Sequence, residues 1–311
     1  MSIPSIPDMK LYYSNKSTLI RVICRTHQWS GIQESNLTDW IQANFKDNEG
    51  RYLAVKILLH SLYYSENNLI ELLRHGIYNI IIGQEIKDSL IQTKNIFVPH
   101  SISEAAVKEK LSKILFIPLL DGNKPNESAN SIVRYLTSNI AIEQKNTAFH
   151  FHINPTDLNN YEKIIILDDC IGSGDQLDSF WNNSFSSVRS EAQKINLPVY
   201  YMALIGNEKS VIDLHLEGRL SGLRVVICDK LDDCNRIYSS ENNIWNSNDE
   251  RNFAIEYFDD IESKYGVPRL GHGNLDFSLV MHNTVPDWTL PIFWTENYDW
   301  KPLMKRKNSS G

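Results

Sequence analysis

The stretch YEKIIILDDCIGSGDQL, residues 161–177, decides the fold of this chain. Four apolar residues, Ile164–Leu167, have the pattern of a buried strand and end in two aspartates, Asp168 and Asp169. A Gly-Ser-Gly turn follows, and the residues after it are typical of a helix. A strand, a glycine-rich turn and a helix in this order predict one unit of a parallel α/β sheet.

The same alternation extends in both directions from this stretch. Strands are predicted in KILFIPLLD (113–121), NTAFHFHI (146–153), KIIILDD (163–169), PVYYMALIG (198–206) and LRVVICD (223–229). Helices are predicted in ESANSIVRYLTSNIAIEQ (127–144), from GDQLDSFWNN (174–183) onward, and in EKSVIDLHLEGRL (208–220). Continuous apolar strands separated by helices indicate a parallel sheet that is covered on both faces.

The two ends of the chain have a different character. The first hundred residues are helical in pattern, and Leu37, Trp40, Ile41 and Phe45 share one face of an expected helix. The segment 51–64 continues this pattern. Toward the end, 247–266 reads as a helix and 270–294 as two strands joined by a Pro-Asp turn. We therefore expect a helical region over 1–105, an α/β domain over 106–300 and a disordered tail over 301–311.

The composition narrows the class of protein. The chain has 311 residues, 42% of them hydrophobic, and a net charge of −7, which disfavours broad electrostatic capture of nucleic acid. Its four cysteines show no zinc or CxxC spacing. A basic, apolar leader is absent from its start, and no apolar run approaches the roughly 20 residues that span a bilayer. We expect a cytoplasmic protein without membrane partners.

The aspartates and the turn indicate the chemistry of a ligand. Ligands of parallel sheets bind at the carboxyl ends of the strands, where we expect Asp168 and Asp169 to face solvent. Gly172 and Gly174 allow the backbone to approach a phosphate, and Ser173 can donate a hydrogen bond to it. Because carboxylates repel phosphate, the aspartates should face hydroxyl groups instead. A sugar phosphate such as ribose 5-phosphate combines both features.

This stretch resembles the phosphoribosyl-diphosphate (PRPP) motif of type I phosphoribosyltransferases. That motif consists of an apolar strand, two acidic residues, two variable apolar residues and a Thr/Ser/Gly loop, which here reads IIIL, DD, CI and GSG. The family closes the loop with a small residue and a threonine, where this chain has Asp175 and Gln176. The resemblance implies a type I phosphoribosyltransferase-like parallel sheet with flanking helices, preceded here by the helical N-terminal region.

The segment 270–294 is similar to the end of the phosphoribosyltransferase-like effectors of bacterial conflict systems, some of them linked to retrons. Its glycine-rich start, apolar strand, Pro-polar turn and final LPIFW carry this resemblance. It implies a toxic effector of antiphage defence, held inactive by a regulatory protein or a nucleoprotein complex, such as a reverse transcriptase with its nucleic acid. Residues 1 to about 100 would then contribute the docking face. The sequence leaves the oligomeric state open.

The resemblance also implies roles for residues. Asp168 and Asp169 would hold the ribose 2′ and 3′ hydroxyls and offset positive charge that develops on the ring. Mg²⁺ would arrive mainly with the diphosphate of the substrate. The expected substrate-binding residues are Cys170, Ile171, Gly172, Ser173, Gly174, Asp175, Gln176, Lys124, Ser128 and Trp294.

Several of these assignments have an ordinary alternative. Lys124, in the loop after the first core strand, either binds pyrophosphate or is a solvated lysine. Trp294 either stacks on a base or packs in the core. His150 and His152 alternate on an expected strand and would share a face, and we interpret them as ordinary histidines because a metal site needs more ligands. The segment 149–160 lies where family members carry a mobile lid.

Three functions remain open at this point. The first is an enzyme that uses PRPP or a related ribose-phosphate donor. The second is a regulatory module that binds the same ligand without catalysis, and the third is a nucleotide glycohydrolase. A Walker B strand would also end in aspartate, but it requires a GxxxxGK[ST] loop, and the chain has none.

Overall fold

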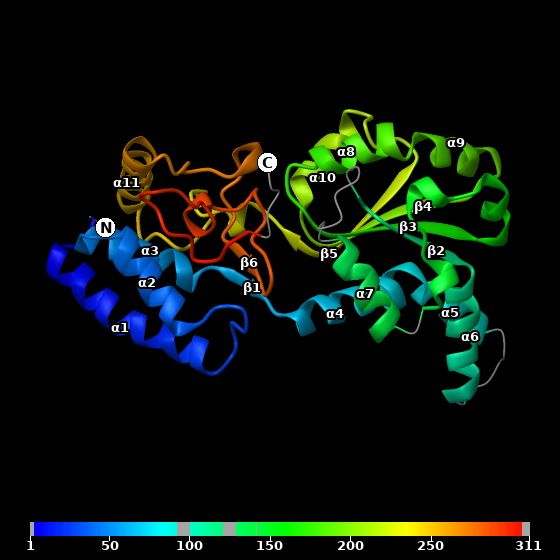
Figure 1. Cartoon of the computed structure of the whole chain (residues 1–311), viewed down its shortest axis with the longest axis horizontal. Coiled ribbons are helices and arrows are strands. Elements are labelled where there is room, and N and C mark those ends of the chain that lie inside the picture. Colours follow the sequence, from blue (N-terminus) through cyan, green and yellow to red (C-terminus); the bar gives the residue numbers. More distant parts are fainter. Residues whose placement is uncertain (1–2, 92–99, 121–128, 141, 307–311) are drawn as a thin grey trace. The chain divides into compact units, whose positions relative to one another are not determined.

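The computed structural model describes residues 3–91, 100–120, 129–140 and 142–306. Its contacts group the chain into two compact units (Figure 1). Unit 1 combines Met1–Asn68 with Leu231–Gly311, and unit 2 is Leu69–Lys230. This grouping differs from the bounds expected at residues 105 and 300, because both ends of the chain contribute to unit 1. Within the described ranges, no helix is long and apolar enough to cross a membrane.

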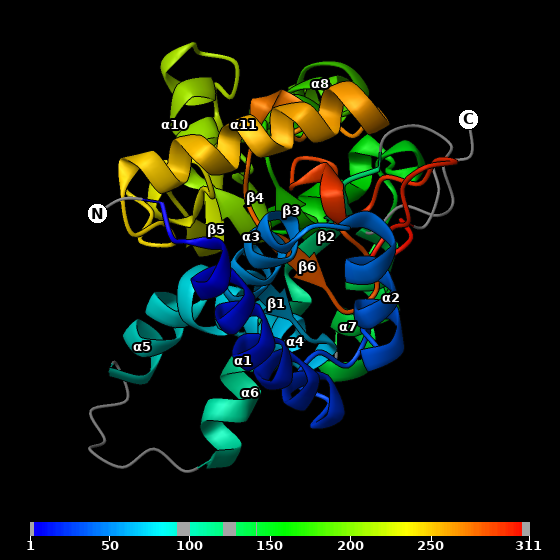
Figure 2. The same ribbon diagram turned by 90° about the vertical axis from the view of Figure 1, so that its left-hand side faces the viewer.

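Unit 1 is mainly helical, with a small parallel sheet. Its elements are α1 (Ile6–Arg25), α2 (Glu34–Asn44), α3 (Asn48–Leu59), β1 (Leu62–Tyr64), α11 (Asn248–Tyr265) and β6 (Leu279–Met281), with 3-10 turns at Asp233–Asn235, His272–Asn274 and Pro291–Phe293. Helix α1 packs along α3 (Figure 2). The helix expected over 51–64 ends at Leu59, and the residues after it form β1, which pairs with β6. This pairing joins segments too far apart in the sequence for a local pattern to reveal.

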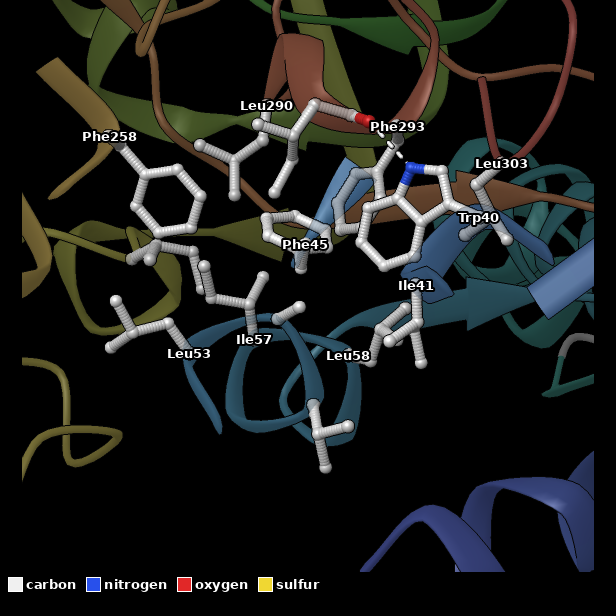
Figure 3. Packing of buried hydrophobic residues seen from close by; sticks show 14 of the residues in the cluster. Trp40, Ile41, Phe45, Leu53, Ile57, Leu58, Phe258, Leu290, Phe293 and Leu303 are labelled. Atoms are coloured by element: carbon white, nitrogen blue, oxygen red, sulfur yellow. Dashed lines mark hydrogen bonds between the residues drawn. The ribbon is translucent and has the colours of Figure 1, made fainter. Parts of the chain in front are cut away.

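The core of unit 1 joins the N-terminal helices to the C-terminal segment. Trp40 of α2 donates its indole N–H to the carbonyl oxygen of Ile292 at 2.9 Å (Figure 3). Phe45 packs edge-on against Trp40 and against Trp300, with ring centroids 5.2 and 5.4 Å apart. Because buried indoles need a hydrogen-bond partner, the Trp40 contact fixes α2 against the C-terminal segment that contains Ile292.

The C-terminal segment differs from the expectation in two respects. Of the two strands expected in 270–294, the structure has only the short β6, followed by turns and irregular backbone. The expected disordered tail is packed over its described part, 301–306. Leu303 is buried, its N–H bonds the Phe293 carbonyl at 2.8 Å, and Lys301 exchanges two hydrogen bonds with the Asn44 side chain.

Unit 2 is the predicted α/β layer structure. Its elements are α4 (Glu66–Arg74), a π-helical turn His75–Ile81, α5 (Gly83–Ile91), α6 (His100–Ser112), β2 (Ile114–Pro118), α7 (Ala129–Asn139), β3 (Lys163–Ile171), α8 (Asp175–Ser179), a π-helical turn Phe180–Ser184, α9 (Ser186–Lys194), β4 (Val199–Asn207), α10 (Glu208–Leu216) and β5 (Leu223–Leu231). α4 and β5 each cross from one unit to the other.

In the described residues of unit 2 the sheet has the strand order β2-β3-β4-β5. β3 runs parallel to both neighbours, with Ile164 opposite Leu115 and Val199. α8 and α10 lie over one face of this sheet, and α7 lies under the other (Figures 1 and 2). The fold is therefore α/β with a parallel sheet and flanking helices, as predicted.

The strand expected over 146–153 is wrong. Only Thr147 forms a bridge, to Phe116 of β2. A 3-10 turn precedes it at Gln144–Asn146, and two more follow at His150–His152 and Pro155–Asn160. Within this segment, Ala148 and Ile153 pack partly buried against the core formed with β3 and β4. Phe149 and Phe151 are exposed. His150 and His152 therefore do not share a strand face.

Candidate functional site

The strand β3 carries the aspartate pair beyond the end of its neighbour. Ile164 and Ile166 pack in the core beneath α8 and α9, and Ile165 and Leu167 alternate to the other face. β2 ends opposite Leu167, whereas the pairing with β4 continues to Ile171. The aspartates therefore lie inside the strand but at the carboxyl edge of the sheet on its β2 side.

Both aspartates are buried, in contrast to the expected solvent-facing position. Asp168 is 5% exposed and Asp169 8%. Asp168 Oδ1 accepts the N–H of Asp169 at 2.9 Å, and its Oδ2 accepts the hydroxyl hydrogen of Tyr201 at 2.8 Å. Asp169 Oδ1 accepts the N–H of Cys170 at 2.9 Å. The neighbouring strand β4 contributes the fully buried Tyr201, which contacts Asp168.

Burial and mutual repulsion change the protonation of this pair. Burial, and then the charge of Asp169, raise the pKa of Asp168 well above its ordinary value. Burial, and then the charge of Asp168, likewise raise the pKa of Tyr201. Two adjacent buried carboxyl groups cannot both ionise easily. In the free site, the raised pKa thus favours the protonated form of Asp168.

The turn after the strand requires glycine at one position. Gly174 has φ +86°, and a Cβ there would lie 2.4 Å from Leu214 Cδ1 of α10. The turn therefore brings the backbone close to α10, and a side chain at residue 174 would prevent this. The turn begins at Gly172, directly after Ile171 at the end of β3. Gly172 and Ile171 are both buried.

The side chains of the turn bond to each other. Ser173 Oγ donates to Asp175 Oδ2 at 2.8 Å, and the N–H of Asp175 points at Ser173 Oγ at 3.4 Å. Gln176 is exposed in the first turn of α8. A phosphate that binds here would have to displace the carboxylate of Asp175 from the Ser173 hydroxyl.

Three further residues were predicted for the site: Lys124, Ser128 and Trp294. Lys124 and Ser128 fall outside the described residues. Trp294 belongs to unit 1, where it packs against the hydrophobic core, donates its indole N–H to the Thr289 carbonyl at 3.3 Å and stacks with Arg306 at 5.1 Å. These contacts correspond to the core-packing interpretation of Trp294.

The histidines of the segment before β3 join aromatic neighbours. His150 packs edge-on against Phe180 at 5.1 Å, and burial lowers the pKa of His150. His152 lies against Phe151 at 4.5 Å. Within the part of the chain that the structure describes, no three potential metal ligands come together. His150 is half-buried among these rings, and His152 is exposed.

Tyr201 is the residue that sequence reasoning missed. It lies in the apolar run of β4, next to the motif strand. A tyrosine buried in such a run needs a partner for its hydroxyl. The two aspartates of the neighbouring strand could supply this partner. A tyrosine inside the apolar run of β4 was therefore the sequence signal for its contact with the aspartate pair.

The donor set suits a hard cation that brings ligands of its own. Asp168 and Asp169 supply carboxylate oxygens, and no third carboxylate joins them among the described residues. Mg²⁺ in proteins is often held by one or two carboxylates together with substrate phosphates and water. Two carboxylates alone would complete the coordination of Mg²⁺ only if the ion brought most of its ligands with it.

A family model matches most of the chain. The PRTase-CE family model matches residues 37–306, which is more than half of the chain and includes the aspartate pair, the turn and the C-terminal segment. No curated protein and no solved structure is similar enough to count as a match.

Proposed function

The chain belongs to the PRTase-CE family, a phosphoribosyltransferase-like family, and on this premise we propose that it is an enzyme that uses PRPP or a related ribose-phosphate donor. The observation that carries the proposal is the buried Asp168–Asp169 pair beside the glycine turn, at the carboxyl edge of the sheet. Sugar hydroxyls and a sugar phosphate are the groups that these two elements recognise best.

The protonation of the pair suits a ribose ring. Hydroxyl groups that donate to Asp168 and Asp169 favour the ionised carboxyls, because hydrogen bonds to the charged form lower a pKa. The ionised pair would then offset positive charge that develops on the ring when its C1 bond to diphosphate breaks. Tyr201 holds Asp168 in place for this role. Mg²⁺, when bound, neutralises the diphosphate that leaves.

A second candidate is a module that binds the ligand without catalysis. The bond between Ser173 and Asp175 bears on ligand binding in both candidates, because a carboxylate occupies the hydroxyl that would contact the 5′-phosphate. Charge repulsion there would weaken the binding of a phosphate. A nucleotide glycohydrolase that uses the same pair remains a third possibility.

The further proposal is that the protein is a toxic effector of antiphage defence, such as a retron, silenced by a companion protein or nucleoprotein. An apolar stripe on α1 supports a docking role for the N-terminal region. Leu11, Leu19 and Val22 are 60%, 46% and 48% exposed. Their spacing brings them to one side of the helix.

The test of the enzyme is direct. The protein is incubated with PRPP, Mg²⁺ and a metabolite extract, and mass spectrometry follows pyrophosphate and phosphoribosylated products. We expect pyrophosphate release by the wild type and its loss in Asp168→Asn and Asp169→Asn. Asp213→Asn, an exposed position on α10, is the matched control.

The outcomes separate the candidates. Release of pyrophosphate supports the enzyme, and full activity of the double Asn variant refutes the assigned site. Binding of PRPP without turnover, strengthened in Asp175→Asn, identifies the sensing module. Release of free base from nucleotides, without added PRPP, identifies the glycohydrolase.

A further inference from the structure

A pocket in unit 1 lies apart from the aspartate motif in the sequence. Its volume is about 390 Å³, and the start of α1, the C-terminal half of α3 and the segment before α11 line it. All of its lining residues belong to unit 1. Pockets of this size hold small molecules. None of these lining residues belongs to the aspartate motif.

The floor of the pocket contains a buried ammonium group. The Lys56 side chain is only 4% exposed, and its Nζ donates to Glu250 Oε1 at 2.5 Å and to the Tyr52 hydroxyl at 3.1 Å. Its Nζ also lies 5.4 Å from the ring centre of Trp245. An ammonium group has three N–H donors, and these two hydrogen bonds use two of them. One donor is left for a molecule in the pocket.

The floor carries no net charge. Glu250 is fully buried, and its second oxygen, Oε2, accepts the N–H of Asn246 at 2.6 Å. The charge of Lys56 is thus matched by Glu250. At the rim, Asp8 adds a carboxylate and is exposed. A phosphate group in this pocket would meet an uncompensated negative charge.

The rim offers hydrogen-bond acceptors. His60 Nδ1 lies 2.8 Å from the Lys56 carbonyl oxygen, which can only accept, so Nδ1 carries the hydrogen. The other ring nitrogen, Nε2, is then an acceptor in the neutral imidazole. The Asp8 carboxylate is a second acceptor. The pocket therefore combines a donor at its floor with acceptors at its rim.

An aromatic ring completes the wall. Tyr12 lines the pocket and packs edge-on against Tyr52, with ring centroids 5.0 Å apart and planes at 73°. We propose that the pocket binds a small planar heterocycle of the nucleobase type that bears an amino group. A ring nitrogen or carbonyl oxygen accepts from Lys56, the amino group donates to Asp8 or His60, and the ring lies against Tyr12.

Calorimetric titration of the full chain tests this site. The probes are adenine, cytosine and uracil, with adenosine and adenosine monophosphate as a pair that differs by one phosphate. We expect saturable binding of adenine or cytosine, weaker binding of uracil, which lacks the amino group, and weaker binding of the monophosphate than of adenosine. Asp8→Asn should weaken the binding of the amino base at least fivefold.

The controls keep the charge and the fold constant. Glu256→Gln removes one exposed negative charge from α11 in unit 1 and should leave binding unchanged. Lys56→Met combined with Glu250→Gln keeps the floor neutral, removes the ammonium donor and should abolish binding, with circular dichroism to verify folding. Absence of saturable binding, equal binding by Asp8→Asn, or tighter binding of the monophosphate than of adenosine overturns the proposal. None of these results depends on PRPP turnover.

Discussion

Tyr201 on strand β4 donates its hydroxyl hydrogen to Asp168 Oδ2 on strand β3, across 2.8 Å. Both side chains are buried, and Asp169 lies next to Asp168 on the same strand. The bond gives one oxygen of a crowded carboxyl pair a fixed partner. It thereby links the packing of the sheet to the protonation of the candidate site.

Tyr201→Phe should destabilise unit 2 by about 1–3 kcal/mol. The substitution removes a buried donor and leaves Asp168 Oδ2 without a partner. Urea denaturation followed by circular dichroism measures the loss. The matched control is Tyr200→Phe on the same strand, whose hydroxyl accepts from exposed Arg224 at 2.7 Å and should matter by less than about 0.5 kcal/mol. Equal losses in the two variants would contradict the role assigned to Tyr201.

Asp168→Asn should become stabilising, relative to the wild type, as the pH rises. The pKa of Asp168 is raised in the folded state above its ordinary value of 3.8, so the folded protein keeps a proton that the unfolded chain releases. This contribution to stability is complete below pH 3.8 and is lost as the pH rises through the folded-state pKa. Asparagine is neutral throughout and avoids this loss.

Thermal unfolding between pH 4 and pH 8 checks the sign. The melting temperature of Asp168→Asn minus that of the wild type should grow with pH by about 2–4 °C, which corresponds to roughly 1 kcal/mol in a domain of this size. Asp213→Asn, exposed on α10, should show a constant difference. A gap that shrinks with increasing pH would mean that Asp168 is ionised and well stabilised.

The sequence predicts the sheet well but the site only in part. Apolar runs such as Ile164–Leu167 mark the four buried strands of this sheet, whereas the strand expected over 146–153 does not form. The burial of Asp168 follows from the continuation of β3 along β4, which no local pattern encodes. The bond between Ser173 and Asp175 likewise depends on the geometry of a turn, although both residues were recognised as part of the motif.

The organisation of unit 1 is also invisible to local patterns. Trp40 bonds to the Ile292 carbonyl, 252 positions away in the sequence. Leu62, expected in a helix, pairs with Leu279 instead. Periodicity reports which face of an element is buried, but it does not report which distant segment buries it.

Gly174→Ala should destabilise unit 2 more than Gly218→Ala. Both glycines have positive φ, +86° and +73°, so alanine is strained at each by about 1–2 kcal/mol. Only at Gly174 would the new Cβ also meet Leu214, whereas nothing lies within 4 Å at Gly218. The additional cost of overpacking is about 1–3 kcal/mol, measurable by urea denaturation. Equal costs would show that α10 shifts to make room for the turn.

The pair of Lys56 and Glu250 should behave as a coupled unit in a double-mutant cycle. Lys56→Met alone leaves a buried carboxylate without its cation and should cost about 3–5 kcal/mol. Adding Glu250→Gln removes that charge and should restore most of the loss, because a neutral polar group is cheaper to bury. Additive effects of the two substitutions in urea denaturation would contradict direct coupling.

The last prediction concerns the apolar stripe on α1 and rests on the proposed silencing partner. Replacing Leu11, Leu19 and Val22 by serine should leave the stability of the isolated chain within about 1 kcal/mol, because these side chains are largely exposed. At an interface, the same side chains would be desolvated, and their loss would weaken docking. We therefore expect the triple variant to be more toxic than the wild type when both are expressed with the neighbouring genes.

The control has to remove exposed apolar surface from another place. Leu216, at the end of α10 in unit 2, is 81% exposed, so Leu216→Ser changes exposed surface without touching the stripe. Growth curves with and without the neighbouring genes, together with co-purification of a companion protein, give two independent readings. If the stripe variant is silenced as fully as Leu216→Ser and still retains its companion, α1 is not the docking face. If the wild type is equally harmless in both settings and purifies alone, the proposal of a regulated effector fails, and an unregulated metabolic enzyme explains the aspartate pair better.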